Sequence, residues 1–137
     1  MRRLLIAAAF AATSACAHAG QPAELAEIMR QNAADATADA SNISREADPD
    51  ARAAKCHVFL ALSRNLNSRN VGHDDAAMRR AQGQWYGDLR SRMPKIEVDQ
   101  LIASTGNILE PADPVARDAA SRFCVDNAPT IAKPAVD

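Results

Sequence analysis

Residues 48–67, DPDARAAKCHVFLALSRNLN, carry the clearest helix signal in the chain and decide its fold. Asp48 is a favoured N-cap, because its carboxylate can accept hydrogen bonds from the free N–H groups of the first turn, and Pro49 suits the first helical position. Mainly apolar side chains then recur at helical spacing, which predicts one wide buried face: Cys56, Phe59, Leu60, Leu62, Ser63 and Leu66. The opposite side is predicted to hold Ala54, His57, Ala61, Arg64 and Asn65.

The N-terminal sequence MRRLLIAAAFAATSACAHA has the three parts of a secretory leader. Two arginines precede an apolar run at residues 4–12 that is too short to span a bilayer, and residues 17–19 form a small-x-small cleavage site. We therefore expect a signal peptide over residues 1–19, cleavage before Gly20 and a periplasmic protein.

A second route of processing stays open at Cys16. Residues 12–16, ATSAC, loosely resemble the lipobox of bacterial lipoproteins, in which the cysteine is lipidated after cleavage in front of it. Thr13 stands where that pattern has leucine, so we favour the soluble form. On the second route the protein would be an outer-membrane lipoprotein, and only then do we expect membrane contact, because no other segment is apolar enough to cross a bilayer.

The composition of the exported part favours a single all-α domain. Residues 20–137 carry 14 basic and 17 acidic residues once the two leader arginines are removed, a net charge of −3. Ala, Leu, Arg, Glu and Gln are abundant, whereas alternation of β-branched residues is nearly absent. We predict a small bundle of four to five helices, with a loosely packed N-terminal helix (20–47), a disulfide-closed helical domain (48–127) and a tail (128–137).

The N-terminal helix is expected to be weakly anchored. Pro22 can begin it, and its short apolar stripe consists of Leu25, Ile28 and Met29. Beyond Asn32 the sequence AADATADASN has helix propensity but little to bury, so we expect this part to pack loosely or fray.

A second strong helix is predicted after a turn-rich connection at residues 67–73. Asp74 or Asp75 caps it, Pro94 ends it, and its apolar stripe consists of Met78, Ala81, Trp85, Leu89 and Met93. Glycines lie on roughly the opposite side, each at a cost of about 1 kcal/mol relative to alanine. They mark either the close approach of a neighbouring helix or a contact face for a partner, flanked by arginines: Arg79, Arg80, Gly83, Gly87 and Arg90.

Two further helices complete the prediction. One covers residues 96–109, with Gly106 and Asn107 as a candidate break before its end. Its apolar positions are Val98, Leu101, Ile102, Thr105, Ile108 and Leu109. The last helix is capped by Asp113 and opened by Pro114. Its inward positions are Val115, Ala119, Ala120, Phe123 and Cys124.

Cys56 and Cys124 are the only free pair of cysteines after either cleavage, because Cys16 is either removed with the leader or lipidated. Both lie on predicted inward faces, and an oxidising periplasm favours their pairing, with two unpaired buried thiols as the alternative. A disulfide that closes so long a loop stabilises a domain by about 4 kcal/mol. No CxxC or HxxxH pattern indicates a metal site, and the CxxCH motif of haem attachment is missing, so we expect no cofactor.

This small exported helical domain with one disulfide resembles the acid-stress chaperones of the HdeA type. The resemblance rests on size, export, helicity and the Cys56-x-x-Phe59-Leu60 start of a helix. The general design is also similar to periplasmic immunity proteins, which are small exported inhibitors of a neighbour's toxin. The first resemblance implies a chaperone with many clients, and the second implies a protein that binds one partner tightly.

Few residues offer catalytic chemistry. His57 has no carboxylate or serine at helical spacing to orient it, so we expect it on the surface or rim of its helix. His73 precedes Asp74 and Asp75, which suggests a metal ligand, but both aspartates are better explained as caps. Without an HExxH motif, a GxSxG motif or a phosphate-binding glycine loop, we do not expect an enzyme.

Charge is distributed unevenly along the chain. Residues 20–50 carry a net charge of −5, residues 51–95 carry +6 and residues 96–137 carry −4. Either the acidic helices fold against the basic ones, or the basic middle stays exposed toward an acidic protein or an anionic surface. Nucleic acid is not an expected partner of an exported acidic domain.

We therefore expect a protein-binding domain, and within that class an inhibitor or immunity-type partner of another periplasmic or envelope protein. A chaperone of the HdeA type and a structural envelope protein lipid-anchored at Cys16 are the alternatives. The predicted partner-binding residues are Arg79, Arg80, Gly83, Gly87 and Arg90. No catalytic or metal-binding residue is predicted, and the binding of a small molecule is left open.

Overall fold

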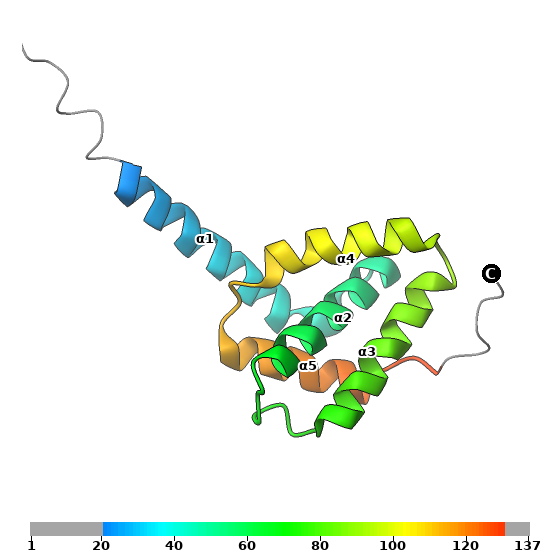
Figure 1. Ribbon diagram of the computed structural model, residues 1–137. Coiled ribbons are helices and arrows are strands. Elements are labelled where there is room, and N and C mark those ends of the chain that lie inside the picture. Colours follow the sequence, from blue (N-terminus) through cyan, green and yellow to red (C-terminus); the bar gives the residue numbers. More distant parts are fainter. Residues whose placement is uncertain (1–20, 131–137) are drawn as a thin grey trace, which may run out of the picture.

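The computed structural model describes residues 21–130 and shows an all-α bundle (Figure 1). The predicted leader, Cys16 and the end of the tail lie outside these residues. The described part contains five α-helices, one short 3₁₀ turn and no strand, which confirms the predicted fold class. In chain order the elements are α1 (Gln21–Ser41), η1 (Ile43–Arg45), α2 (Pro49–Asn65), α3 (Asp75–Arg90), α4 (Lys95–Leu109) and α5 (Pro114–Asp126).

Helix α2 is the centre of the bundle, packed against α3, α4 and α5 (Figure 1). It begins as predicted, because the Asp48 carboxylate accepts hydrogen bonds from the Asp50 and Ala51 backbone N–H groups. Phe59 and Leu60 are fully buried. Each such side chain stabilises the fold by about 1.5–3 kcal/mol relative to an exposed position.

The predicted disulfide joins Cys56 of α2 to Cys124 of α5, across 68 residues of sequence. Both cysteines are fully buried. The indole N–H of Trp85 donates a hydrogen bond to the Cys124 carbonyl oxygen, 2.8 Å away, and so ties α3 to the same point. Three helices therefore meet at one crosslinked position.

Helix α1 reverses the expected pattern of burial. Leu25, Ile28 and Met29, the predicted stripe, are 57–62% exposed, while Ala36 and Ala40, in the part expected to fray, are buried. The N-terminal half of α1 projects beyond the bundle, whereas its second half lies on α4 and α5 (Figure 1). Small alanines allow this close approach, and the larger side chains stand past the edge of the neighbouring helices.

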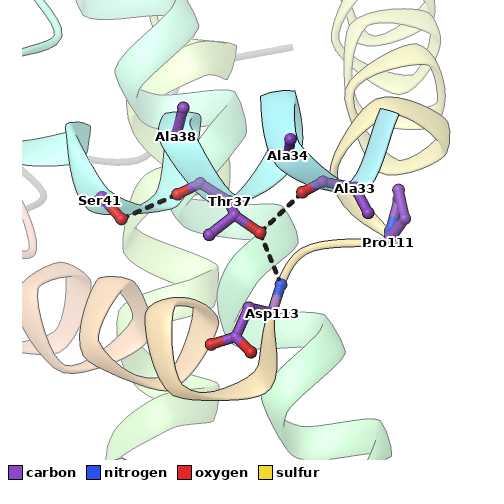
Figure 2. A pocket seen from close by; sticks show the side chains of 7 residues that line it. All are labelled: Ala33, Ala34, Thr37, Ala38, Ser41, Pro111 and Asp113. Atoms are coloured by element: carbon purple, nitrogen blue, oxygen red, sulfur yellow. Dashed lines mark hydrogen bonds between the residues drawn. The ribbon is translucent and has the colours of Figure 1, made fainter. Parts of the chain in front are cut away.

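Thr37 fastens the second half of α1 to the turn between α4 and α5. Its hydroxyl donates to the Ala33 carbonyl oxygen at 2.7 Å and accepts from the Asp113 backbone N–H at 2.9 Å, as Figure 2 shows. The Asp113 carboxylate in turn caps α5 by accepting from the first backbone N–H groups of that helix. This part of α1 therefore has a packed side, contrary to the expectation that it has little to bury.

Several expected inward positions at helix ends are exposed instead. Leu66, the C-cap of α2, is 62% exposed, Ile108 near the end of α4 is 59% exposed, and Val115 at the start of α5 is 77% exposed. A helix end is covered only where a neighbour reaches it, and helical spacing carries no information about that reach. Ala119 is exposed as well, and α4 continues without a break through Gly106.

The interior also holds residues that were expected to face solvent. Ala54 is fully buried, because α2 is covered on more sides than its apolar stripe indicated. On α5 the side that packs against α2 contains Arg117, Asp118 and Ser121, all buried. Polar groups therefore form part of the α2–α5 contact.

Candidate binding surface on helix α3

Helix α3 exposes three of the predicted partner-binding residues, Arg79, Arg80 and Gly83, whereas Gly87 and Arg90 are half-buried. The Asp74 carboxylate caps the helix by accepting from the Ala77 backbone N–H at 2.7 Å, which confirms a predicted alternative. The buried stripe of α3 consists of Met78, Ala81, Trp85 and Leu89. At 3.6 residues per turn the opposite side of the helix contains Arg80, Gly83 and Gly87. Below, "the α3 face" means Arg79, Arg80, Gly83, Gly87 and Arg90.

Gly83 is exposed, and a Cβ atom built on it would meet no atom within 4 Å. Close approach of a neighbouring helix was one explanation of the glycines, and it is wrong for this position. Packing among residues 21–130 therefore does not account for a residue that costs a helix about 1 kcal/mol relative to alanine.

The arginines of the α3 face differ in their surroundings. Arg79 is exposed and pairs with Asp75, one turn earlier, at 2.7 Å. Arg90 donates to the Met93 carbonyl oxygen. Arg80 is exposed and makes no ion pair with any residue between 21 and 130. A surface pair within one helix contributes only about 0.3–0.5 kcal/mol, so Arg79 is not fixed by its pair either.

A polar chain beneath the α3 face connects it to α2. His57 of α2 contacts Gln82 of α3 twice: its Nδ1 lies 3.2 Å from the Gln82 carbonyl oxygen, and its Nε2 lies 3.3 Å from the Gln82 side-chain nitrogen. The Gln82 side-chain oxygen accepts from the Arg64 guanidinium at 2.6 Å. Arg64 also pairs with Asp75 at 2.8 Å, so this series of polar contacts ends at the first residue of α3.

This chain of contacts fixes the tautomer of His57. The carbonyl oxygen can only accept, so Nδ1 carries the proton; the Gln82 amide NH₂ donates to Nε2, because its oxygen is held by Arg64. Burial lowers the pKa of His57 below its ordinary value of 6.5, and the hydrogen bond to the Gln82 carbonyl opposes this in part. A proton on Nε2 would place two donors against each other. His57 is therefore half-buried between two helices rather than on a free rim.

The loop that leads into α3 is held by one ridge of α5, which the sequence analysis missed. Asp118 accepts from the Ser68 hydroxyl, Arg122 donates to the Val71 and Asn70 carbonyl oxygens at 2.8 Å, and Asp126 accepts from His73 at 2.9 Å. The three α5 residues are spaced by four and so lie along one ridge. That spacing of charged residues was visible in the sequence, but it is also typical of a solvated helix face.

Asp118 also anchors a buried polar cluster between α2 and α5. Its Oδ1 atom lies 3.1 Å from the Ser63 hydroxyl and 3.2 Å from two nitrogens of Arg117. The Ser63 and Ser121 hydroxyls are 2.8 Å apart, and Ser121 donates to the Phe59 carbonyl oxygen. Every one of these side chains is engaged, so the cluster positions the loop and offers no free nucleophile.

Two surface grooves were considered as ligand sites. The groove of Figure 2, about 580 Å³, lies between α1 and the α4–α5 turn. Three of its seven lining residues are alanines, and its two hydroxyls donate to backbone carbonyl oxygens. A second groove, about 590 Å³, lies at the α2–α3 loop. Its acids are engaged as a helix cap and in ion pairs with Arg64 and Arg79. Neither groove presents a convergent set of unengaged polar groups.

The described residues also bear on metal binding and membrane contact. Between residues 21 and 130 no group of three or more His, Cys, Asp or Glu side chains could hold a metal ion. In the same part of the chain, no helix combines the length and apolar character that crossing a bilayer requires.

The first interpretation of the uneven charge holds for part of the basic middle. Lys55 of the basic middle pairs with Asp39 at 2.8 Å and Glu46 at 2.7 Å, and Arg92 pairs with Asp50 at 2.6 Å, so part of the acidic N-terminal segment does fold against it. The α3 face receives none of these acids. Within the face Arg79 pairs with Asp75, and Arg90 lies close enough to Asp99 to interact with its charge.

Comparison with known proteins gives no relative. No protein-family model matches the chain, and neither a curated protein nor a solved structure matches it.

Proposed function

We propose that this protein is an exported protein-binding domain, an inhibitor or immunity-type partner of another envelope protein, and that it binds through the α3 face. Gly83 is the observation that carries the proposal. A glycine that destabilises its helix and has open space around it is accounted for by a contact outside the molecule. Removal of the side chain lets the backbone of a partner approach the helix closely.

The chemistry of the α3 face favours an acidic partner. Arg80 makes no ion pair among residues 21–130, and Arg79 can exchange its exposed pair with Asp75 for an external carboxylate. Arginine forms paired hydrogen bonds with carboxylates and is enriched in the residues that dominate protein interfaces. An acidic segment that lies along α3 would meet guanidinium groups on both sides of Gly83.

The support beneath the α3 face suits a rigid binder. Trp85 links α3 to the disulfide through Cys124, and the α5 ridge holds the loop that precedes α3. A surface fixed before binding loses little conformational entropy on association, which favours affinity for one partner over loose contact with many.

The test is native mass spectrometry of the protein isolated gently from its own host's envelope, followed by replacement of the face. We expect a complex with one defined protein, and at least about a tenfold loss of affinity in the triple variant R79A/R80A/R90A. The matched control is Arg45→Ala, an exposed arginine on η1. Unchanged affinity in the triple variant would contradict the proposal.

A chaperone of the HdeA type is the second candidate. The exposed Leu25, Ile28 and Met29 favour it, because clients are held through apolar surface. That function requires the fold to loosen in acid and to suppress the aggregation of several unrelated proteins. Acid titration combined with an aggregation assay separates the two functions, since an inhibitor stays folded and protects none of them. The intact mass reports acyl chains on Cys16 if the protein is a lipid-anchored envelope component.

A further inference from the structure

We infer that the N-terminal half of α1 docks on the α3 face of a second copy of this chain. "The arm" here means residues 21–32, the part of α1 that projects beyond the bundle (Figure 1). The inference concerns self-association, and it can hold or fail independently of the proposed external partner.

The apolar side of the arm continues the buried face of α1, but no part of the bundle covers it. Leu25 and Met29 lie on the same side of the helix as Ala36 and Ala40, because the spacings of four and seven residues are helical repeats. The two alanines are buried on the bundle, whereas Leu25 and Met29 are 58% and 62% exposed. The larger half of one continuous apolar stripe is therefore uncovered, and a neighbouring molecule can cover it.

Charge favours the α3 face of the second copy as the surface that covers the arm. Glu24 stands beside Leu25 and Ile28 on the arm, is exposed, and makes no ion pair within residues 21–130. On α3, Arg80 is likewise exposed and makes no ion pair within the same residues. Glu27 already pairs with Arg30 and adds nothing to the choice. The arm therefore presents an unpaired acid beside its apolar residues, and the α3 face presents an unpaired base.

These two surfaces cannot meet within one molecule. Helix α1 packs on α4 and α5, and its projecting end points away from α3 (Figure 1). The complementary charges can therefore pair only between copies. Each copy has one arm and one α3 face, so in a two-fold dimer each arm lies on the α3 face of the other copy.

The α3 face also has open space at Gly83, where an added Cβ atom would meet no other atom within 4 Å. Gly83 and Gly87 are four residues apart and remove two side chains from one side of α3. The three long apolar side chains of the arm, Leu25, Ile28 and Met29, are those that such a strip can accept. An external partner of the α3 face would then compete with the arm of the second copy.

The experiment is sedimentation velocity of the full chain, produced with its own leader and purified with its disulfide intact, over a concentration series. We expect a monomer–dimer equilibrium. Leu25→Asp should abolish the dimer, with Val115→Asp on α5 as the matched control, since Val115 is also an exposed apolar residue. Circular dichroism checks that both variants stay folded.

A charge exchange tests the contact itself. Glu24→Arg and Arg80→Glu should each raise the dissociation constant of the dimer by about tenfold, and the double variant E24R/R80E should recover most of the loss. A protein that stays monomeric at every concentration would overturn the inference. So would a dimer that tolerates Leu25→Asp, or two single effects that simply add in the double variant. An external complex that persists in Leu25→Asp leaves the proposed function intact, so the two claims fail separately.

Discussion

Helices α1 and α2 have similar apolar content but differ in which of their apolar side chains are buried. In α2 the predicted apolar face is buried except for the half-buried Leu62 and the exposed C-cap Leu66, and even Ala54 on its expected outer side is inaccessible. In α1 the large apolar residues are exposed, and the buried positions are alanines. Helical spacing shows which residues share a face, whereas the position and length of the neighbours decide which part of that face is covered.

Among changes to α1 and α2, removal of the disulfide should lower the free energy of unfolding most. The double variant C56A/C124A loses the link between α2 and α5, and its free energy of unfolding should fall by about 4 kcal/mol. Urea unfolding measures the change, and reduction of the wild-type protein with dithiothreitol should reproduce it. A loss below about 1 kcal/mol would show that the bundle does not depend on this crosslink.

Two leucines provide a matched pair between the helices. Leu60 of α2 is fully buried, and Leu25 of α1 is 58% exposed. Leu60→Ala should lower the free energy of unfolding by about 2–5 kcal/mol, because it leaves a cavity. Leu25→Ala should change it by less than about 0.5 kcal/mol. Dilute protein is needed for both unfolding curves, so that self-association does not contribute. Equal losses would contradict the burial assigned to α1.

Two glycines give a smaller contrast, with opposite signs. Gly83 has open space around it in a helix, so Gly83→Ala should raise the free energy of unfolding by about 0.5–1 kcal/mol. Gly72 has φ +81° in the α2–α3 loop, where alanine is strained, so Gly72→Ala should lower it by about 1 kcal/mol. Thermal unfolding of both variants checks the signs. A destabilised Gly83→Ala would reveal an internal packing role.

Titration of His57 should give the smallest change. The pKa of His57 is lower in the folded state than its ordinary value of 6.5, so the folded protein favours the neutral ring. The contribution of His57 to the free energy of unfolding is therefore fully present above pH 6.5. It declines as the pH falls toward the folded-state pKa. The facing groups are Tyr86, with ring centres 5.7 Å apart, and Arg64 through Gln82. His57→Gln should flatten the dependence of unfolding free energy on pH between 7 and 5. An unchanged slope would exclude His57 as its source.

Local signals in the sequence predicted much of the fold. Asp48, Asp74 and Asp113 cap their helices as their residue types indicated, because capping depends only on the next few backbone groups. The disulfide was predictable because the exported part holds only two cysteines. Helix ends and faces were less so, since Leu66 and Val115 have helical spacing but no neighbour.

The candidate site was predicted only in part. The sequence placed Gly83 and the arginines on one side of α3, but it could not show that no helix covers Gly83. Asp118 was missed because a charged residue counts as solvent-facing in any apolar pattern. Its burial depends on Ser63, Ser68 and Arg117, which come from three segments that only the fold brings together.

The most direct test of α3 as a binding face is crosslinking in the living cell. A photoreactive amino acid replaces Gly83, and the control replaces Ala103, which is exposed on α4. Position 83 should give one defined adduct with another envelope protein, together with a homodimer adduct if the arm docks there, and position 103 should give neither. Adducts of equal number and intensity from both positions, or none from position 83, would contradict the account.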